Sequence, residues 1–251
     1  MPCANEKFIK PEILPHGLDG LTLRLGLTLD EETLAAVQEL RAALETKPPE
    51  GVEEIVGSLV SVYVSFDRTR TDRAAVAHWV RDITARTQLT GKALPRPTRR
   101  WTIPVTLGGE DGPQFAELAK QGDLTETKAR KIILETPVRV LTIGFAPGLP
   151  YMGLLPKTWD IPRLSQITPN VPRGALVAAL RQLIIFTNPT PTGWRHIGKT
   201  AFKGFDPARN PATFLKSGDE IRFSPATPAE MRALENDNSD GRGGARLEAL
   251  T

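Results

Sequence analysis

The stretch GFAPGLPYMG, residues 144–153, combines three glycines and two prolines with two aromatic rings, Phe145 and Tyr151. Proline fixes φ and removes a backbone donor, and glycine permits conformations that other residues avoid, so the chain leaves any preceding strand here. Taken alone, the stretch predicts either a tight surface turn or the wall of a ligand pocket. Its neighbours in the sequence must distinguish the two.

Short β-rich segments surround this stretch, and glycine and proline separate them. The six clearest are WTIPVTL (101–107), VRVLTIGF (138–145), GALVAAL (174–180), LIIFT (183–187), WRHIGK (194–199) and EIRFSP (220–225). Two short helical segments, near 113–121 and 125–135, lie between the first two strands. Many short strands with frequent turns predict a barrel or folded sheet rather than alternating βαβ units.

The first third of the chain has a different pattern. Alternating leucines over 21–25 predict a strand, and Thr28 and Glu31 stand at the spacing of a helix capping box. Apolar residues then recur at helical spacing at Leu34, Val37, Leu40 and Leu44, and again at Val76, Trp79, Val80 and Ile83. The β-rich segment IVGSLVSVYVSF (55–66) lies between these helices. The order strand, helix, two strands, helix predicts a compact α/β unit over about residues 17–88.

Composition divides the chain further. TQLTGKALPRPTRR (87–100) is typical of a linker, and the polar, glycine-rich NDNSDGRGGARLEALT (236–251) predicts disorder. The predicted organisation is an N-terminal extension over 1–16, an α/β domain over 17–94, a β-barrel domain over 95–235 and a disordered tail over 236–251.

The residue content argues against several classes of protein. A net charge of +3 with interleaved acids and bases does not indicate a nucleic-acid partner, and no apolar run is long enough for a membrane span. The first residues lack the pattern of a secretory signal, so a cytoplasmic location is expected. Lone Cys3 excludes an internal disulfide framework, and His16, His78 and His196 are too scattered in sequence to indicate a zinc site.

The chain also shows no phosphate-binding loop and no glycine-rich dinucleotide motif. LGGEDGP (107–113) could direct backbone N–H groups at an anion, but a glycine turn before a helix explains it equally well, and the turn is the expectation. A complete, autonomous catalytic set is therefore not visible.

Four segments occur in the order and spacing of one family. They are IPVTLGGEDGPQFAELAKQ (103–121), GFAPGLPYMG (144–153), TGWRHIGKT (192–200) and FDPARNPATFLKSGDEIRFSP (205–225). Through them, residues 17–235 resemble the first subunit of the allophanate hydrolase-like or carboxyltransferase family, which includes KipI and the 5-oxoprolinase subunit PxpB. The resemblance implies an α+β protein: a small α/β, ferredoxin-like domain followed by a cyclophilin-like β-barrel.

The resemblance also implies a heteromer. Family members work with a KipA/PxpC-type second subunit at a shared site for a small amide-like substrate. With a LamB/YcsF-type subunit they cleave 5-oxoproline to glutamate with ATP, and related domains in urea carboxylase transfer a carboxyl group from carboxybiotin to urea. We therefore expect a non-autonomous subunit of a 5-oxoprolinase or a biotin-linked carboxyltransferase that binds no cofactor alone and meets ATP or biotin through its partners. The alternative is a KipI-like inhibitor that binds a sensor histidine kinase.

The resemblance assigns candidate site residues. Tyr151 and Gln182 are the catalytic candidates, and the substrate-binding candidates are Phe145, Gly148, Arg163, Trp194, Asp206 and Arg209. Structural roles compete with these functional roles. The rings of Phe145 and Tyr151 can plug the barrel mouth, and the Trp194 indole can serve packing alone. Asp206 and Arg209 can form a salt bridge or a turn. The chain departs from its relatives over 174–187, where Leu180-Arg181 replaces a glycine pair and Leu183-Ile184 replaces Thr-Gly.

Overall fold

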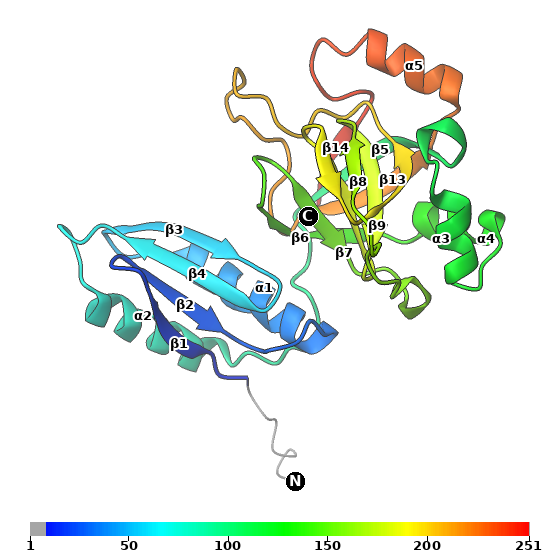
Figure 1. Ribbon diagram of the computed structural model, residues 1–251. Coiled ribbons are helices and arrows are strands. Elements are labelled where there is room, and N and C mark those ends of the chain that lie inside the picture. Colours follow the sequence, from blue (N-terminus) through cyan, green and yellow to red (C-terminus); the bar gives the residue numbers. More distant parts are fainter. Residues whose placement is uncertain (1–8, 251) are drawn as a thin grey trace. The chain divides into compact units, whose positions relative to one another are not determined.

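The computed structural model describes residues 9–250 and divides the chain into two units after Arg96 (Figure 1). The sequence predicts a boundary between residues 94 and 95, close to this division. Cys3 lies outside the described residues. Within residues 9–250, no helix has the length and apolar character that crossing a membrane requires.

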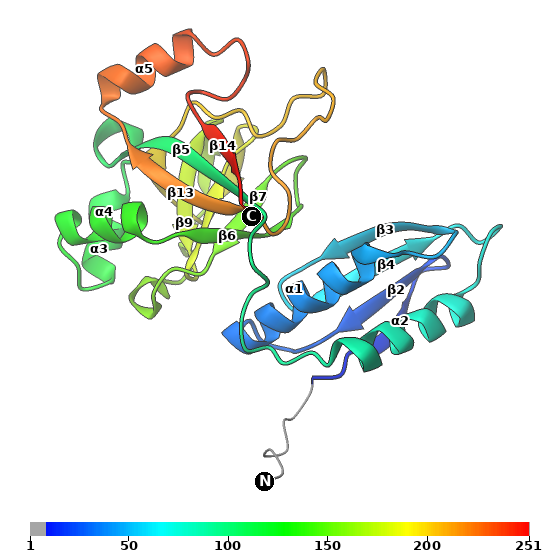
Figure 2. The same ribbon diagram turned by 180° about the vertical axis from the view of Figure 1, so that it is seen from behind.

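The first unit is a four-stranded antiparallel sheet, in the order β1-β2-β4-β3, with two helices. Its elements are β1 (Glu12–His16), β2 (Gly20–Arg24), α1 (Glu31–Thr46), β3 (Val52–Gly57), β4 (Ser61–Phe66) and α2 (Arg73–Thr87). Both helices cover the same face of the sheet, as the views from opposite sides show (Figures 1 and 2). Leu21, Leu23, Val62 and Val64 of the central strands are buried beneath them. The unit is ferredoxin-like, as the resemblance implies.

Two expectations for this unit are wrong. Residues 12–16 are not part of an extension: they form β1, which pairs with β2 along its whole length. The N-cap of α1 is Asp30 rather than Thr28, because the Asp30 carboxylate accepts the Thr33 N–H at 2.7 Å. Asp30 stands directly before the first helical residue, where a side-chain acceptor reaches the unpaired N–H groups of the first turn.

The second unit is a closed seven-stranded barrel of the cyclophilin-like kind. Neighbouring strands follow the order β12-β9-β10-β7-β6-β13-β5, and pairing of β5 with β12 closes the ring. The barrel strands are β5 (Arg99–Leu107), β6 (Val138–Ile143), β7 (Pro150–Gly153), β9 (Ala175–Ala179), β10 (Gln182–Ile185), β12 (Arg195–Lys199) and β13 (Glu220–Pro225). Only the pair β5–β13 among these is parallel.

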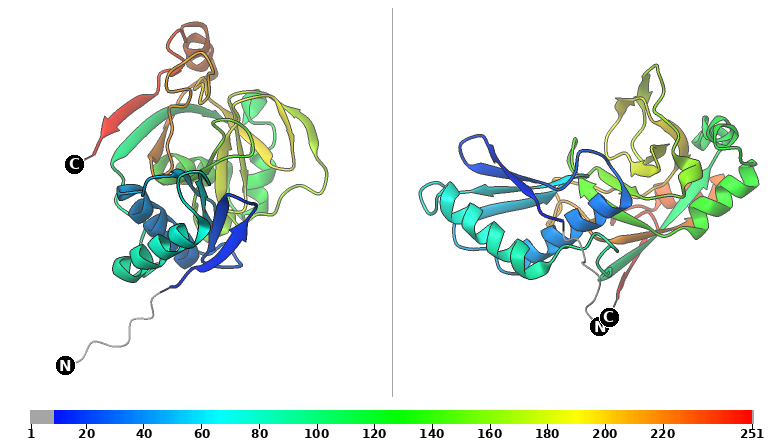
Figure 3. Two further views of the ribbon diagram at one scale, coloured as in Figure 1. Left: turned by 90° about the vertical axis from the view of Figure 1, so that its left-hand side faces the viewer. Right: turned by 90° about the horizontal axis from the view of Figure 1, so that it is seen from below.

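Further elements surround the barrel (Figure 3). They are the short helices η1 (Gly109–Asp111) and η2 (Lys157–Trp159), the helices α3 (Phe115–Gln121), α4 (Glu126–Glu135) and α5 (Pro228–Asn236), and the strands β8 (Thr168–Val171), β11 (Thr190–Thr192) and β14 (Arg246–Ala249). Strands β8 and β11 pair only with each other, and we call them the β8–β11 ribbon.

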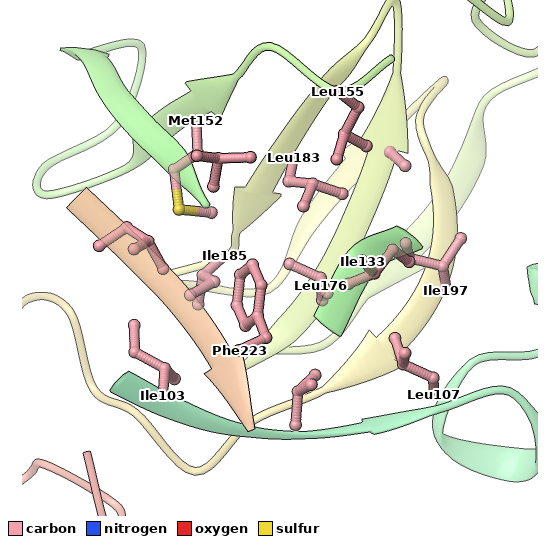
Figure 4. Close-up of a cluster of buried hydrophobic side chains, with 14 of the residues drawn as sticks. Ile103, Leu107, Ile133, Met152, Leu155, Leu176, Leu183, Ile185, Ile197 and Phe223 are labelled. Carbon is pink, nitrogen blue, oxygen red and sulfur yellow. The ribbon is translucent and has the colours of Figure 1, made fainter. Parts of the chain in front are cut away.

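The barrel has an apolar interior and a separate apolar cluster outside it. Met152, Leu183 and Ile185 point inward, and Ile133 of α4 joins them (Figure 4). The alternate residues of the same strands, such as Ile184, belong to the outer cluster, together with Val171 of the β8–β11 ribbon. Because side chains alternate along a strand, β7 and β10 supply both clusters.

The predicted disorder of the tail is wrong for residues 236–250. Strand β14 pairs with the first half of β5, from Arg246 opposite Thr102 to Ala249 opposite Arg99 (Figure 2). Asn238 is buried, donates to the Ala201 carbonyl at 2.6 Å and accepts the Gly243 N–H at 2.8 Å. All four β14 residues are exposed, so backbone pairing rather than apolar burial holds this strand.

Candidate functional site

A pocket of about 270 Å³ lies on the outer face of the barrel, between strands β7 and β10 and the β8–β11 ribbon. Four of the predicted site residues line it: Phe145, Tyr151, Arg163 and Trp194. Buried apolar side chains form its floor, namely Leu149, Ile184 and Phe186. Tyr151 lies opposite Ile184 and packs with the outer cluster, so its ring does not plug the barrel mouth.

The GFAPGLPYMG stretch is both a turn and a wall of this pocket. Its turn closes where the Gly144 N–H donates to the Leu149 carbonyl at 3.1 Å and the Leu149 N–H donates to the Ala146 carbonyl at 3.1 Å. Phe145 has a φ of +69° and is 83% exposed, so the turn holds an apolar ring in water in a backbone conformation that non-glycine residues avoid. Strained backbone that presents an exposed ring beside a pocket is typical of a functional loop.

Gly148 does not line the pocket. Its φ is +68°, and a Cβ there would lie 2.7 Å from the Phe205 Cβ, so the position needs glycine for close packing against the 204–213 segment. The structure supports a packing role for this candidate rather than contact with a substrate.

Tyr151, Trp194 and Arg163 form a row of groups in contact. The rings of Tyr151 and Trp194 meet edge to face with centroids 6.0 Å apart, and the Arg163 guanidinium carbon lies 5.3 Å from the Trp194 ring centroid. Trp194 is 5% exposed and packs in the outer cluster, whereas Arg163 is exposed. Such contacts orient both the phenol and the cation relative to the indole.

Two polar groups of the pocket have no polar partner within residues 9–250: the Tyr151 hydroxyl and the Arg163 guanidinium. Burial raises the pKa of the Tyr151 phenol, and the nearby Arg163 charge opposes this rise. Tyr151 is therefore a neutral O–H donor at pH 7. A guanidinium that pairs with carboxylates and a phenol that donates to a carbonyl oxygen are both available to a ligand.

The other predicted residues lie outside the pocket. Gln182 is the first residue of β10 and lies opposite Gly153 of β7. It is on the same face of the strand as Ile184, two residues before it, and is 2% exposed. Asp206 accepts the Ala208 N–H at 2.9 Å, as in a turn. The Arg209 guanidinium donates to the Pro211 and Ala212 carbonyls and lies 3.5 Å from the Phe214 ring centroid. These contacts fit the turn role that the sequence left open for residues 206 and 209.

Sequence reasoning missed several lining residues: Ile167, Thr190, Pro191, Thr192 and Gly193. They belong to the β8–β11 ribbon and its flanks, where no apolar alternation marks a strand. Ile184 and Phe186 were detectable, because period-2 alternation in LIIFT places them on one face, away from Leu183 and Ile185.

Neither a metal cage nor the LGGEDGP loop forms a second centre. Within the described residues, no group of three or more His, Cys, Asp or Glu side chains could hold a metal ion. The loop forms η1, and a Cβ on Gly112 would lie 2.1 Å from the Ile197 carbonyl oxygen, so this glycine serves close backbone packing. His196 of β12 is buried, and its Nε2 has no hydrogen-bond partner in the described chain.

The fold and the family match together define a carboxyltransferase-type domain. Urea amidolyase of Kluyveromyces lactis shares this fold, with a TM-score of 0.72 at 16% identity over 98% of this chain and 17% of that one. The family model described as carboxyltransferase domain, subdomain C and D, matches residues 11–215, and the chain belongs to this family.

Two further relatives are more similar in sequence. A protein of Bacillus subtilis (strain 168), named as the B-type subunit of 5-oxoprolinase, is 28% identical over 238 residues, which span 92% of this chain and 99% of the relative. The solved structure of TTHA0988 is 28% identical with a TM-score of 0.67, over 84% of this chain. This chain spans 40% of TTHA0988.

Proposed function

We propose that this chain is the B-type subunit of a heteromeric, ATP-dependent 5-oxoprolinase-type complex and that its pocket forms one part of a shared site. The name of the Bacillus subtilis relative, together with its alignment over 99% of its length, supports this choice. The urea amidolyase is 16% identical to this chain, so its similarity supports a shared fold and does not imply carboxyl transfer.

The observation that carries the proposal is the pair of unpartnered polar groups in an aromatic-walled pocket. The Arg163 guanidinium suits a carboxylate, and the neutral Tyr151 hydroxyl suits an amide oxygen. 5-Oxoproline carries both groups on one small ring. In this assignment Arg163 and Trp194 bind the substrate, Phe145 covers it, and Tyr151 donates a hydrogen bond to the lactam oxygen as negative charge develops there.

The rest of the chemistry belongs to partner subunits. The sequence contains no phosphate-binding loop, so ATP and the group that activates water come from a KipA/PxpC-type subunit and a LamB/YcsF-type subunit. This chain alone holds no cofactor and does not turn over substrate. The exposed Phe145 ring lies at the open side of the pocket, where a partner completes the site. The presence of ATP in the reaction fits a cytoplasmic location.

The test is reconstitution of the complex. The chain is purified with candidate partner subunits from the same genome, and 5-oxoproline-dependent ADP release is measured for every combination. We expect turnover only when this chain and its partners are present together. Turnover by this chain alone, carboxyl transfer from carboxybiotin to an amide, or inhibition of a sensor histidine kinase without any 5-oxoproline cleavage would each contradict the proposal.

A further inference from the structure

Arg195 of β12 is a buried charge that the proposed site does not use. Its side chain is 4% exposed, its Nε donates to Glu117 of α3 at 3.1 Å, and its Nη1 donates to the Pro162 carbonyl at 2.6 Å. Burying a guanidinium is costly unless its donors are satisfied, so both bonds matter for its placement. The second bond ends on the residue directly before Arg163.

A second bond ties the other side of Arg163. The Leu164 N–H donates to the Gly193 carbonyl at 2.6 Å. The backbone on both sides of Arg163 is therefore fixed to the residues on both sides of Trp194. Arg163 itself is exposed, and its guanidinium carbon lies 5.3 Å from the Trp194 ring centroid, so this backbone attachment limits where its long side chain can move.

We propose that Arg195 is a positioning residue: it holds the 162–164 segment against β12 and thereby keeps the Arg163 guanidinium over Trp194, at the pocket. This inference deepens the proposed function, because it rests on the same pocket and gives Arg163 a fixed place from which to bind a carboxylate. A merely structural Arg195 would instead join α3 to β12 without any effect on Arg163.

Tyr151 reports where Arg163 lies. The Arg163 charge lowers the pKa of the Tyr151 phenol against the effect of burial, so loss of that charge from the pocket raises this pKa. The chain has only two tyrosines, and Tyr63→Phe leaves Tyr151 as the single phenol. In that background, 3-fluorotyrosine labelling and 19F NMR follow one titration without substrate or partner.

We expect Arg163→Gln to raise the pKa of this phenol, because it removes the positive charge that lowers it. Arg195→Met, which keeps a buried stem and removes both donors, should raise it in the same direction and by a similar amount. With Arg163→Gln already present, Arg195→Met should add nothing, because it acts through Arg163. Arg195→Lys keeps the charge and one donor group, so it should give a smaller rise and provides a second variant with a milder change.

The matched control is Arg130→Gln. Arg130 also donates to a backbone carbonyl, that of Leu107, and lies 4.9 Å from the Phe115 ring, but it is not among the groups that shift the pKa of Tyr151. It should leave the phenol pKa unchanged. The proposal is overturned if folded Arg195→Met and Arg195→Lys leave the phenol pKa unchanged, or if Arg195→Met shifts it equally with and without Arg163. This titration measures no turnover, so its result is independent of the reconstitution assay that tests the proposed function.

Discussion

The Tyr151 hydroxyl faces a pocket without a partner in the described chain, so it contributes little to folding and remains free for a ligand. We expect Tyr151→Phe to leave the melting temperature nearly unchanged and to lower the activity of the reconstituted complex by roughly tenfold or more, the scale of a lost hydrogen bond to a reacting group. Steady-state rates of the complex and thermal melts of the variant chain measure both effects.

Tyr63→Phe is the matched control, because it removes the chain's other phenol from the first unit. It should leave the activity of the complex unchanged. Full activity in Tyr151→Phe would show that the hydroxyl is a bystander, and a large loss of stability would assign it a role in packing.

His196 makes the barrel sensitive to mild acid. Its pKa is lowered mainly by burial; Lys199 also lowers it, whereas a hydrogen bond to Gly198 and the charge of Asp111 oppose the shift. The unfolded chain then takes up the proton first as pH falls through about 6.5, so the free energy of unfolding decreases from there toward the pKa of the folded state. Urea unfolding between pH 7.5 and 5.5, followed by tryptophan fluorescence, measures this decrease.

His196→Gln should flatten this pH dependence, because the amide does not titrate in that range. The control is His78→Gln, at a side chain that is 76% exposed, and it should keep the wild-type dependence. An unchanged slope in His196→Gln would show that other groups cause the effect.

Helix α1 depends on one carboxylate at its start. Asp30→Ala should lower the stability of the first unit by about 1 kcal/mol, the usual loss for an N-cap, whereas Thr28→Ala should have little effect. The Thr33 N–H lowers the pKa of Asp30, so the stabilisation is complete above about pH 4 and is lost as pH falls further. Native-state amide exchange in α1 measures both variants, and equal losses at positions 28 and 30 would refute this cap.

Strands that bury apolar side chains were predictable from the sequence, and strands at exposed edges were not. Short continuous apolar runs mark β9 and β10, all of whose residues are buried. By contrast, β1 contains Pro15, and β14 has no buried residue. Backbone pairing holds β14, and in β1 it is joined by the half-buried Ile13; composition does not reveal backbone bonds.

The turn between β9 and β10 explains the departure at residues 180 and 181. Leu180 and Arg181 have φ values of 52° and 64°, the left-handed region that a two-residue hairpin turn requires. The glycine pair that the resemblance implies at these two positions would suit this geometry. Here the Leu180 N–H bonds to the Ile161 carbonyl, and Arg181 Nε bonds to the Leu155 carbonyl, so neighbouring segments fix the turn without glycine.

The candidate site was predictable only in part. Four of the candidates, Phe145, Tyr151, Arg163 and Trp194, line one pocket, because the loops that carry them meet on one face of β7 and β10. Gln182 shares that face but lies beyond the pocket, a distinction that depends on strand register. The ribbon residues were missed because a two-stranded ribbon packed on a barrel has no strong periodic signal.

The barrel unit as a whole includes the last residues of the chain. We expect slow amide exchange over 246–250, where β14 pairs with β5 and the Leu250 N–H donates to the Thr98 carbonyl at 2.8 Å. Deletion of 246–251 should expose the β5 edge over 99–102 and promote self-association. Hydrogen-exchange mass spectrometry and sedimentation measure these outcomes.

Leu247→Ala keeps the β14 backbone and changes only an exposed side chain, so it should behave as the wild type. Rapid exchange across 246–250 would restore the expectation of a disordered tail.

The pairing of β5 with β13 and β14 also orders events during synthesis. Every strand and helix of the first unit precedes residue 97, so this unit can fold while the barrel is still being made. Strand β5 emerges next, but its lateral partners over 220–225 and 246–249 are translated last. At about 5–20 residues per second, β5 waits on the order of ten seconds with an open edge. A nascent barrel of this connectivity therefore offers chaperones a defined time window, which closes only after β13 and β14 have emerged and paired with β5.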